Sequence, residues 1–353
     1  MTVQTVLVGK PKILIRNKGM KRIDNLYDRI CDEQNIFLAY INARKGKGRT
    51  HGVMEFEKEL DGNIKSIQKE LLECTYKTPE YETFFIHDPK EREIFRLPFR
   101  DRVVHHAIMN VLESVWTPLF ISQTYSCIKG KGIHGVLKHL KRDLKDEKRT
   151  EYCLKMDIRK YYPSVNHDVL KGIIRKKIKD VKLLALLDGI IDSAPGIPIG
   201  NYLSQFFANL YLSYFDHWLK EEKRVRYYYR YADDMVILGE NKRELHRLLV
   251  EIRGYLSENL KLTLKDNWQI FPVKSRGIDF VGYVFYHDHV KMRKSIKKNF
   301  CRKVARLNKS GATGKEMKCA LSSWLGWAKH CNSKNLLKKV VKDETVSRVG
   351  SKC

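Results

Sequence analysis

Adjacent aspartates are the first feature of this chain that suggests chemistry. Asp233 and Asp234 lie between two runs of aromatic and β-branched residues that alternate as in a β-hairpin, which puts the pair at the turn. Neighbouring carboxylates repel, and each raises the pKa of the other unless a cation offsets their charge. Taken alone, an Asp-Asp pair is more often ordinary turn chemistry than a site.

A third aspartate shifts the balance towards a site. The segment EYCLKMDIRKYYPSV alternates as a strand does, so Asp157 is expected at a strand end, on the face opposite Leu154 and Met156. Three carboxylates on adjacent strands can hold two divalent cations about 4 Å apart, as in-line phosphoryl transfer requires. Oxygen ligands suit Mg²⁺, which shares its coordination shell with substrate phosphates. The sequence therefore predicts a site for two Mg²⁺ ions.

Helices and short strands must position these carboxylates. Apolar spacing predicts helices over residues 100–116, over 202–218 with Asn201 as N-cap, and from Lys242 onwards. The segment 224–240 predicts two strands folded back on each other. Further short strands are expected within 271–292, followed by a basic helical region. This order is typical of an α+β fold.

The first of these predicted helices carries two histidines. His105 and His106 are adjacent and have no companion in metal-site spacing, so structural roles are expected.

The overall charge favours a polyanionic partner. Among 353 residues, 68 are lysine or arginine and 41 are acidic, giving a net charge of +27. Nucleic acid is the preferred partner, with a ribosomal protein or a membrane-surface binder as alternatives. No apolar run is long enough to span a bilayer, the N-terminus lacks the features of a signal peptide, and a cytoplasmic protein is expected. The eight cysteines form no CxxC pair, which argues against a zinc site.

Six motifs together resemble the reverse transcriptase family. They occur in the family's order and cover roughly residues 40–290: RLPFRDRVVHHAIMNVLESVW (96–116), YSCIKGKGIHGVLKHL (125–140), DIRKYY (157–162), GIPIGNYLSQFFANLYL (196–212), YADD (231–234) and GIDFVGY (277–283). The resemblance implies a right-hand polymerase fold with an antiparallel palm sheet and a helical thumb. Its expected divisions are an N-terminal extension (1–20), mainly fingers (21–150), mainly palm (151–290), thumb (291–342) and a polar tail (343–353).

The resemblance also implies roles for individual residues. Asp157 and Asp233 would bind both metals with the Ile158 carbonyl, and Asp234 would support the site. Tyr162 would lie under the sugar and exclude a 2′-hydroxyl, which makes dNTPs the expected substrates; a core tyrosine is the alternative. The expected triphosphate contacts are Lys129, Lys131 and, more weakly, Arg96. Lys265 would protonate pyrophosphate, although an exposed helix-end or loop lysine fits equally well.

The loop before the second helix resembles one subfamily. Most reverse transcriptases carry Gln-Gly here, whereas this chain has Ile199-Gly200 followed by Ser204-Gln205. This pattern resembles the enzymes of diversity-generating retroelements, which copy a template-repeat RNA into adenine-mutagenised cDNA with a small basic accessory protein. The nucleotide site would then include Ile199, Gly200 and Gln205. Ile199 offers shape but no hydrogen bond, so we expect it to weaken discrimination by about 1–3 kcal/mol.

Two kinds of alternative remain. A reverse transcriptase of a retron, a group II intron or a phage-defence system would share the three aspartates but is not expected to pair Ile199 with Gln205. An inactive RNA-binding protein on a polymerase scaffold is less favoured, because it would have no reason to keep three mutually repelling carboxylates in a basic groove.

Overall fold

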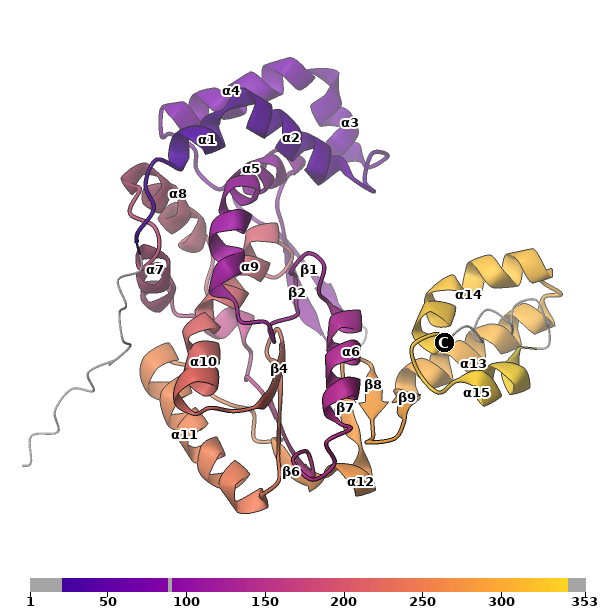
Figure 1. Ribbon diagram of the computed structural model, residues 1–353. Coiled ribbons are helices and arrows are strands. Elements are labelled where there is room, and N and C mark those ends of the chain that lie inside the picture. Colours follow the sequence, from indigo (N-terminus) through magenta and orange to yellow (C-terminus); the bar gives the residue numbers. More distant parts are fainter. Residues whose placement is uncertain (1–20, 88–90, 342–353) are drawn as a thin grey trace, which may run out of the picture.

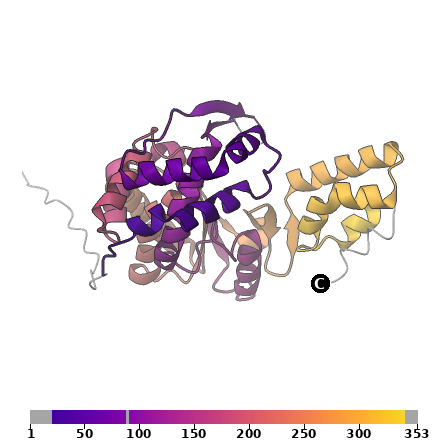
Figure 2. The ribbon, with the colours of Figure 1, turned by 90° about the horizontal axis from the view of Figure 1, so that it is seen from above.

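The chain, described here from a computed structural model, has three parts arranged around a central sheet. Residues 21–87 and 91–341 are described. Helices form a layer at one end, a mixed helix-and-strand body follows, and a helical C-terminal unit stands to the side of the body (Figures 1 and 2). The predicted extension 1–20 and tail 343–353 lie outside the described residues.

The elements have the following bounds. The helices are α1 (Tyr27–Cys31), α2 (Glu33–Arg44), α3 (His51–Lys58), α4 (Leu60–Leu72), α5 (Phe99–Trp116), α6 (Ile133–Asp143), α7 (His167–Arg175), α8 (Val181–Ile191), α9 (Tyr202–Tyr211), α10 (Ser213–His217), α11 (Lys242–Leu260), α12 (Val273–Arg276), α13 (Lys294–Lys309), α14 (Gly314–Ala328) and α15 (Lys334–Val340), with short 3-10 or π turns η1 (Thr117–Leu119), η2 (Tyr162–Ser164) and η3 (Trp218–Glu222). The strands are β1 (Glu82–Ile86), β2 (Arg92–Arg96), β3 (Tyr152–Asp157), β4 (Tyr227–Tyr231), β5 (Asp234–Gly239), β6 (Gln269–Pro272), β7 (Ile278–Phe280), β8 (Tyr283–Phe285) and β9 (Val290–Met292).

A four-stranded antiparallel sheet forms the centre of the body, in the order β4-β5-β3-β6. Its register pairs Asp157, the last residue of β3, with Asp234, the first residue of β5. The predicted hairpin over 224–240 is confirmed as β4 and β5. The other two sheets are the hairpin β1-β2 and the meander β7-β8-β9. All three are antiparallel, so the predicted α+β class is confirmed at the level of a mixed fold with antiparallel sheets.

Both faces of the central sheet are buried, because alternate residues enter two different cores. Leu154 and Met156 belong to the larger core, which also takes residues from α5, α9 and α11. Cys153 belongs to a second core, built with residues of α6 and of the meander β7-β9. The alternation predicted for this strand is therefore confirmed, and it holds the edge that carries Asp157 between two packed layers.

The helix expected over 202–218 is divided. α9 ends at Tyr211, α10 begins at Ser213, and the π turn η3 follows. The Ser213 hydroxyl donates to the Leu210 carbonyl at 2.6 Å, a local bond that competes with regular helix hydrogen bonding. Asn201 occupies the N-cap position of α9 as predicted, but its side chain makes no capping hydrogen bond. The helices predicted over 100–116 and from Lys242 are confirmed as α5 and α11.

The C-terminal unit has a core of its own. Buried residues of α13, α14 and α15 pack together, and a capping box formed by Thr313 and Glu316 begins α14. The unit meets the meander through Trp327, whose ring lies 4.9 Å from that of Tyr283. Across the described ranges, no helix is both long enough and apolar enough to cross a membrane.

Candidate active site

The three predicted aspartates meet where the inner strands of the central sheet end, at the last residue of β3 and the first residue of β5. Asp157 and Asp234 are paired across β3 and β5, and Asp233 occupies the turn between β4 and β5. The preceding residue, Ala232, has a left-handed backbone with φ of 54°. This conformation costs roughly 1–2 kcal/mol for a residue with a Cβ, so the surrounding structure must hold the turn in place.

The electrostatics of these carboxylates are unfavourable for negative charge. Burial, with a further contribution from Asp157, raises the pKa of Asp233. Burial is also the largest cause at Asp234, where the nearby aspartates add to it and Lys155 opposes it, and the pKa rises to about 7. Oδ1 of Asp157 and Oδ1 of Asp234 are buried and receive no hydrogen bond from the described part of the chain.

Two lysines lie against the carboxylates. Lys265 Nζ is 2.5 Å from Asp157 Oδ2, and Lys155 Nζ is 3.7 Å from Asp234 Oδ2. Within residues 21–87 and 91–341, no three His, Cys, Asp or Glu side chains are arranged as a ready-made metal-ligand set. The donors nevertheless fit Mg²⁺, because they are carboxylate oxygens, two of them lack partners, and two of the three groups have raised pKa values.

Tyr162 and the loop before α9 form a wall beside the aspartates. Tyr162 is half-buried, and its carbonyl accepts a 2.9 Å bond from Ile197 N. Gly196 has φ of 63°, and a Cβ there would lie 2.5 Å from the Tyr162 carbonyl oxygen, so only glycine fits this approach. Burial raises the pKa of the Tyr162 phenol, with smaller contributions from Cys127 and Asp233.

The same loop is hydrogen-bonded to the hairpin β1-β2. The Ile199 carbonyl accepts a 2.8 Å bond from Phe95 N, and a Cβ on Gly200, whose φ is 119°, would lie 2.9 Å from the Phe95 carbonyl oxygen. Ile199 is half-buried, whereas Gln205 is exposed on α9.

The remaining predicted residues have varied surroundings. Ile158 is buried and bridges to Leu264, which brings the chain before Lys265 alongside Asp157. Arg96 forms an ion pair with Glu82 across β1 and β2. Lys129 is exposed.

Lys131 has its ammonium group on the protein's own backbone. It donates to the carbonyls of Ile121 and Ser122 at 3.2 and 3.1 Å, an arrangement that the sequence did not indicate. The proposed triphosphate role of Lys131 requires these bonds to be exchanged for bonds to a ligand.

Sequence reasoning missed two residues of this region. Lys155 lies on the same strand face as Asp157, two residues earlier, and strand periodicity gave the signal for it. Arg230 is completely buried behind the turn, and the only signal was a charged residue inside the aromatic strand β4.

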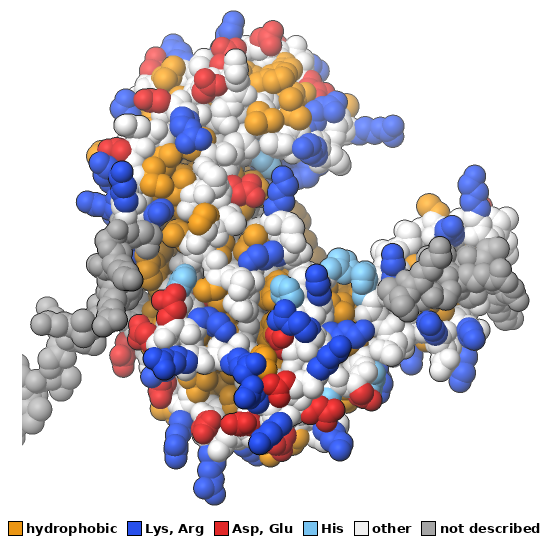
Figure 3. All heavy atoms as spheres, viewed as in Figure 1, with side chains coloured by type: hydrophobic (Ala, Val, Ile, Leu, Met, Phe, Trp, Pro, Cys, Tyr) orange, Lys and Arg blue, Asp and Glu red, His pale blue; other side chains and the backbone are white. Residues whose placement is uncertain are grey.

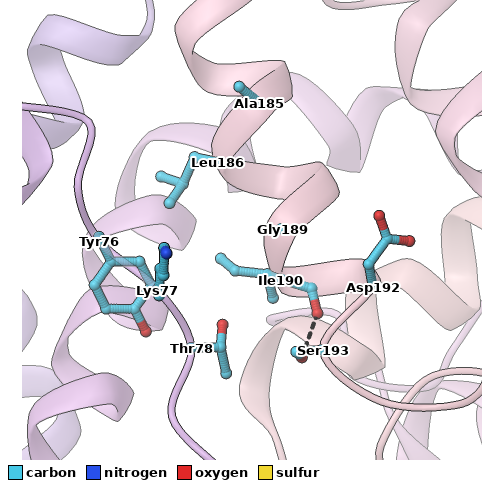
Figure 4. A pocket seen from close by; sticks show the side chains of 9 residues that line it. All are labelled: Tyr76, Lys77, Thr78, Ala185, Leu186, Gly189, Ile190, Asp192 and Ser193. Atoms are coloured by element: carbon cyan, nitrogen blue, oxygen red, sulfur yellow. Dashed lines mark hydrogen bonds between the residues drawn. The ribbon is translucent and has the colours of Figure 1, made fainter.

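A pocket lies elsewhere on the chain. It has a volume of about 270 Å³ between the segment 76–78 and the end of α8, and Thr78, Ile190 and Ser193 are among its lining residues (Figure 4). None of the predicted site residues lines it. The carboxylates, not this pocket, define the candidate site.

The surface is rich in positive charge. Lysine and arginine side chains occur on the N-terminal layer, on the body and on the C-terminal unit, with acidic side chains among them on the N-terminal layer and on the lower part of the body (Figure 3). This distribution agrees with the net charge of +27 and provides cationic groups on all three parts.

Comparison with known proteins identifies the family of the chain. Residues 87–285, more than half of the chain, match the reverse transcriptase (RNA-dependent DNA polymerase) family. The chain therefore belongs to the reverse transcriptase family.

Curated relatives are distant. Protein YkfC of Escherichia coli is 26% identical over 52% of this chain and 60% of its own length. Group II intron-encoded protein LtrA of Lactococcus lactis is 24% identical over 59% of this chain and 38% of its own length. The chain thus spans less than two thirds of either relative. Among solved structures, apo telomerase from Candida tropicalis superposes with a TM-score of 0.48 and 13% identity, over 78% of this chain and 60% of that one.

Proposed function

We propose that the protein is an RNA-directed DNA polymerase that joins dNTPs to a primer by two-metal phosphoryl transfer. The observation that carries this proposal is the meeting of three carboxylates at one sheet edge, two with buried unpartnered oxygens, in a chain of the reverse transcriptase family. Two of these aspartates keep raised pKa values despite two nearby lysines, and shifted pKa values of this kind are enriched at functional sites.

The proposal assigns the three parts to a right-hand polymerase. Residues 21–150 would be mainly fingers, 151–290 mainly palm and 291–342 the thumb. The central sheet and its two covering layers support the assignment of a palm, because they hold the carboxylates at a rigid edge. The separate core of α13 to α15 supports the assignment of a thumb.

The aspartates would hold two Mg²⁺ ions, with Asp157 and Asp233 as shared ligands, the Ile158 carbonyl as an added donor and Asp234 in support. When bound, these ions supply activation of a primer 3′-hydroxyl and stabilisation of charge on the triphosphate. Lys265, whose ammonium group now donates to Asp157 Oδ2, would be released from this bond to donate a proton to the leaving pyrophosphate.

Tyr162 would select the sugar. Its backbone is fixed by the bond from Ile197 N to its carbonyl, and its ring makes an edge contact with Tyr161 at 5.7 Å, which supports a defined position of the ring relative to a 2′-hydroxyl. Ile199, Gly200 and Gln205, together with Lys129, Lys131 and Arg96, would complete the nucleotide site. A rigid half-buried aromatic wall supports discrimination by shape.

The finer assignment is a reverse transcriptase of a diversity-generating retroelement. Ile199 and Gln205 carry it, because the isoleucine side chain presents no hydrogen-bonding group to a base pair. The partners would be a template-repeat RNA, the RNA/cDNA duplex and a small basic accessory protein. LtrA is an intron-encoded protein, so a group II intron-like role is the second candidate.

Primer extension tests the proposal. The purified chain is given dNTPs, Mg²⁺ and a primed RNA template, with and without a candidate accessory protein, and the cDNA is sequenced. Asp233→Asn is the matched control, because it removes a charge and leaves the side-chain volume nearly unchanged. The full proposal is supported if the parent chain makes cDNA with errors concentrated at template adenines and Asp233→Asn makes none.

Other results redirect it. If the cDNA is accurate, the polymerase assignment stands and a retron, intron or phage-defence enzyme is favoured. No synthesis under either condition favours the RNA-binding scaffold.

A further inference from the structure

A buried polar network lies directly behind the aspartate turn. Arg230 on β4 and Asp216 on α10 form an ion pair, and both side chains are completely buried. Arg230 Nε donates to both Asp216 oxygens, at 2.8 and 3.0 Å, and Nη2 donates to Oδ2 at 2.5 Å. Tyr228 and Thr124 donate to the same carboxylate at 2.7 and 3.0 Å.

One arm of this network holds the turn. Arg230 Nη1 donates to the Ala232 carbonyl at 3.2 Å. Ala232 is the left-handed residue that immediately precedes Asp233. The guanidinium group therefore stabilises a backbone conformation that alanine does not favour by itself.

A second arm reaches the loop that leads to Lys129. Arg230 Nη1 also donates to Asn209 Oδ1 at 3.1 Å, and Asn209 Nδ2 donates to the Ser126 carbonyl at 2.8 Å. The backbone of Arg230 pairs with the same loop through Gln123 O and Tyr125 N, both at 3.1 Å.

The loop so held has an unusual backbone. Cys127, directly after Ser126, has φ of 55°. A single guanidinium group thus connects two strained loops that come from distant parts of the sequence.

Stability alone is a poor account of this arrangement. A buried ion pair pays heavy desolvation, and well-packed apolar residues of similar volume often give equal or greater stability. The planar guanidinium group donates in a set direction to the Ala232 carbonyl and reaches the Ser126 carbonyl through Asn209, a directional link that apolar side chains would not supply. The network is therefore better explained by the positioning of the two backbone segments than by a contribution to fold stability.

We propose that Arg230 and Asn209 are positioning residues that jointly set the separation between the aspartate turn and the loop of residues 123–131. This inference rests on the proposed polymerase function, in which the turn bears the metal ligands and the loop bears nucleotide contacts. Neither residue touches substrate; each acts through the backbone that it holds.

Asn209→Leu is the sharpest perturbation. It keeps the branched shape and the number of side-chain heavy atoms, removes the side-chain bonds to Arg230 and to the Ser126 carbonyl, and retains both partners of the Arg230–Asp216 pair. Ser213→Ala is the matched control, because Ser213 is equally buried and loses one hydrogen bond to Leu210 without reaching either loop. If Asn209→Leu lacks a cooperative thermal transition, Thr124→Val is used in its place, because it removes the hydrogen bond that the Thr124 hydroxyl donates to Asp216.

Hydrogen exchange and kinetics are measured on the same full-length variants. Losing about 1.4 kcal/mol of hydrogen bonding should speed amide exchange about tenfold in peptides covering 121–132, and Ser213→Ala should leave them unchanged. The KM for dNTP should rise about tenfold with a smaller change in kcat.

The outcomes separate this inference from the proposed function. If Asn209→Leu exchanges faster but the parent chain shows no polymerase activity, the coupling of the two loops is supported and the proposed polymerase function is rejected. Exchange equal to that of Ser213→Ala overturns the inference, as does faster exchange with KM for dNTP unchanged in an active enzyme.

Discussion

Replacing Gly282 with alanine should loosen the C-terminal unit from the body. Gly282 has φ of 88°, and a Cβ there would clash with two ring atoms of Trp327, one of them at 2.5 Å. The backbone of Gly282 also accepts a 3.0 Å bond from Arg293 N, just before α13 begins. Neither the glycine nor the ring can shift without disturbing the contact between meander and unit.

The magnitude follows from two separate costs. A left-handed residue with a Cβ costs about 1–2 kcal/mol, and overpacking at a buried contact costs about 1–3 kcal/mol. Together they predict about 2–5 kcal/mol of lost anchoring. In a Trp327→Ala background the backbone cost remains, together with a 3.0 Å approach to the flexible end of Ile296, so the same substitution should cost about 1–2 kcal/mol there.

The assay is the protection of the C-terminal unit against proteolysis and hydrogen exchange. Gly326→Ala is the control, because Gly326 lies on the same helix as Trp327 and a Cβ added there would meet nothing within 4 Å. That substitution should gain about 0.5–1 kcal/mol of helix stability. Equal protection of α13 to α15 in Gly282→Ala and in the parent chain would refute the reasoning, and so would a cost unchanged by the loss of Trp327.

Three further outcomes are expected. Tyr162→Val should raise incorporation of ribonucleotides relative to dNTPs by about 10- to 100-fold, because the aromatic wall beside the sugar shrinks; unchanged discrimination in competition assays would contradict this. Ile199→Gln should lower misincorporation at template adenines about tenfold, measured by cDNA sequencing, and an unaltered error spectrum would remove Ile199 from the account of infidelity. Burial lowers the pKa of His105 to about 3, so below about pH 6.5 the unfolded chain binds the extra proton. Folding stability should therefore fall by about 2 kcal/mol between about pH 8 and pH 5 through this residue, and urea unfolding of His105→Phe should lack that part of the slope.

Local periodicity explains why much of the site could be predicted from the sequence. Side chains alternate strictly along a strand, so the pattern around Asp157 fixed both its face and its place at the end of β3. The hairpin followed from two β-rich runs around a short turn, which left Asp233 no other position. The structural roles of the two histidines were predicted from their lack of companions in metal-site spacing. In the structure, His105 is buried and the ring of His106 stacks on that of Tyr202 at 4.4 Å.

Contacts between distant segments were beyond such reasoning. Apart from Ala232, the side-chain partners of Arg230 lie on α10, on α9 and in the loop at Thr124, 14 to 106 residues away in sequence, and no local pattern encodes which of them will meet. Lys131 shows the same limit, because a lysine in a glycine-bearing loop suggests a phosphate ligand while its ammonium group lies on two carbonyls. The break after Tyr211, where the Ser213 hydroxyl donates to the Leu210 carbonyl, was likewise not signalled by the apolar spacing.

The division between predicted and unpredicted residues has a physical meaning for catalysis. The aspartates proposed to hold metal ions lie at strand ends, and strand periodicity therefore reveals them. Residues that hold the edge itself are buried, and their polar groups are satisfied only in the folded chain. Asp216 accepts from three different side chains, so a change at any one of them alters the hydrogen bonding of all. Substitutions behind the turn should therefore couple strongly to one another, while Gly282→Ala, at the meander, should add to them independently.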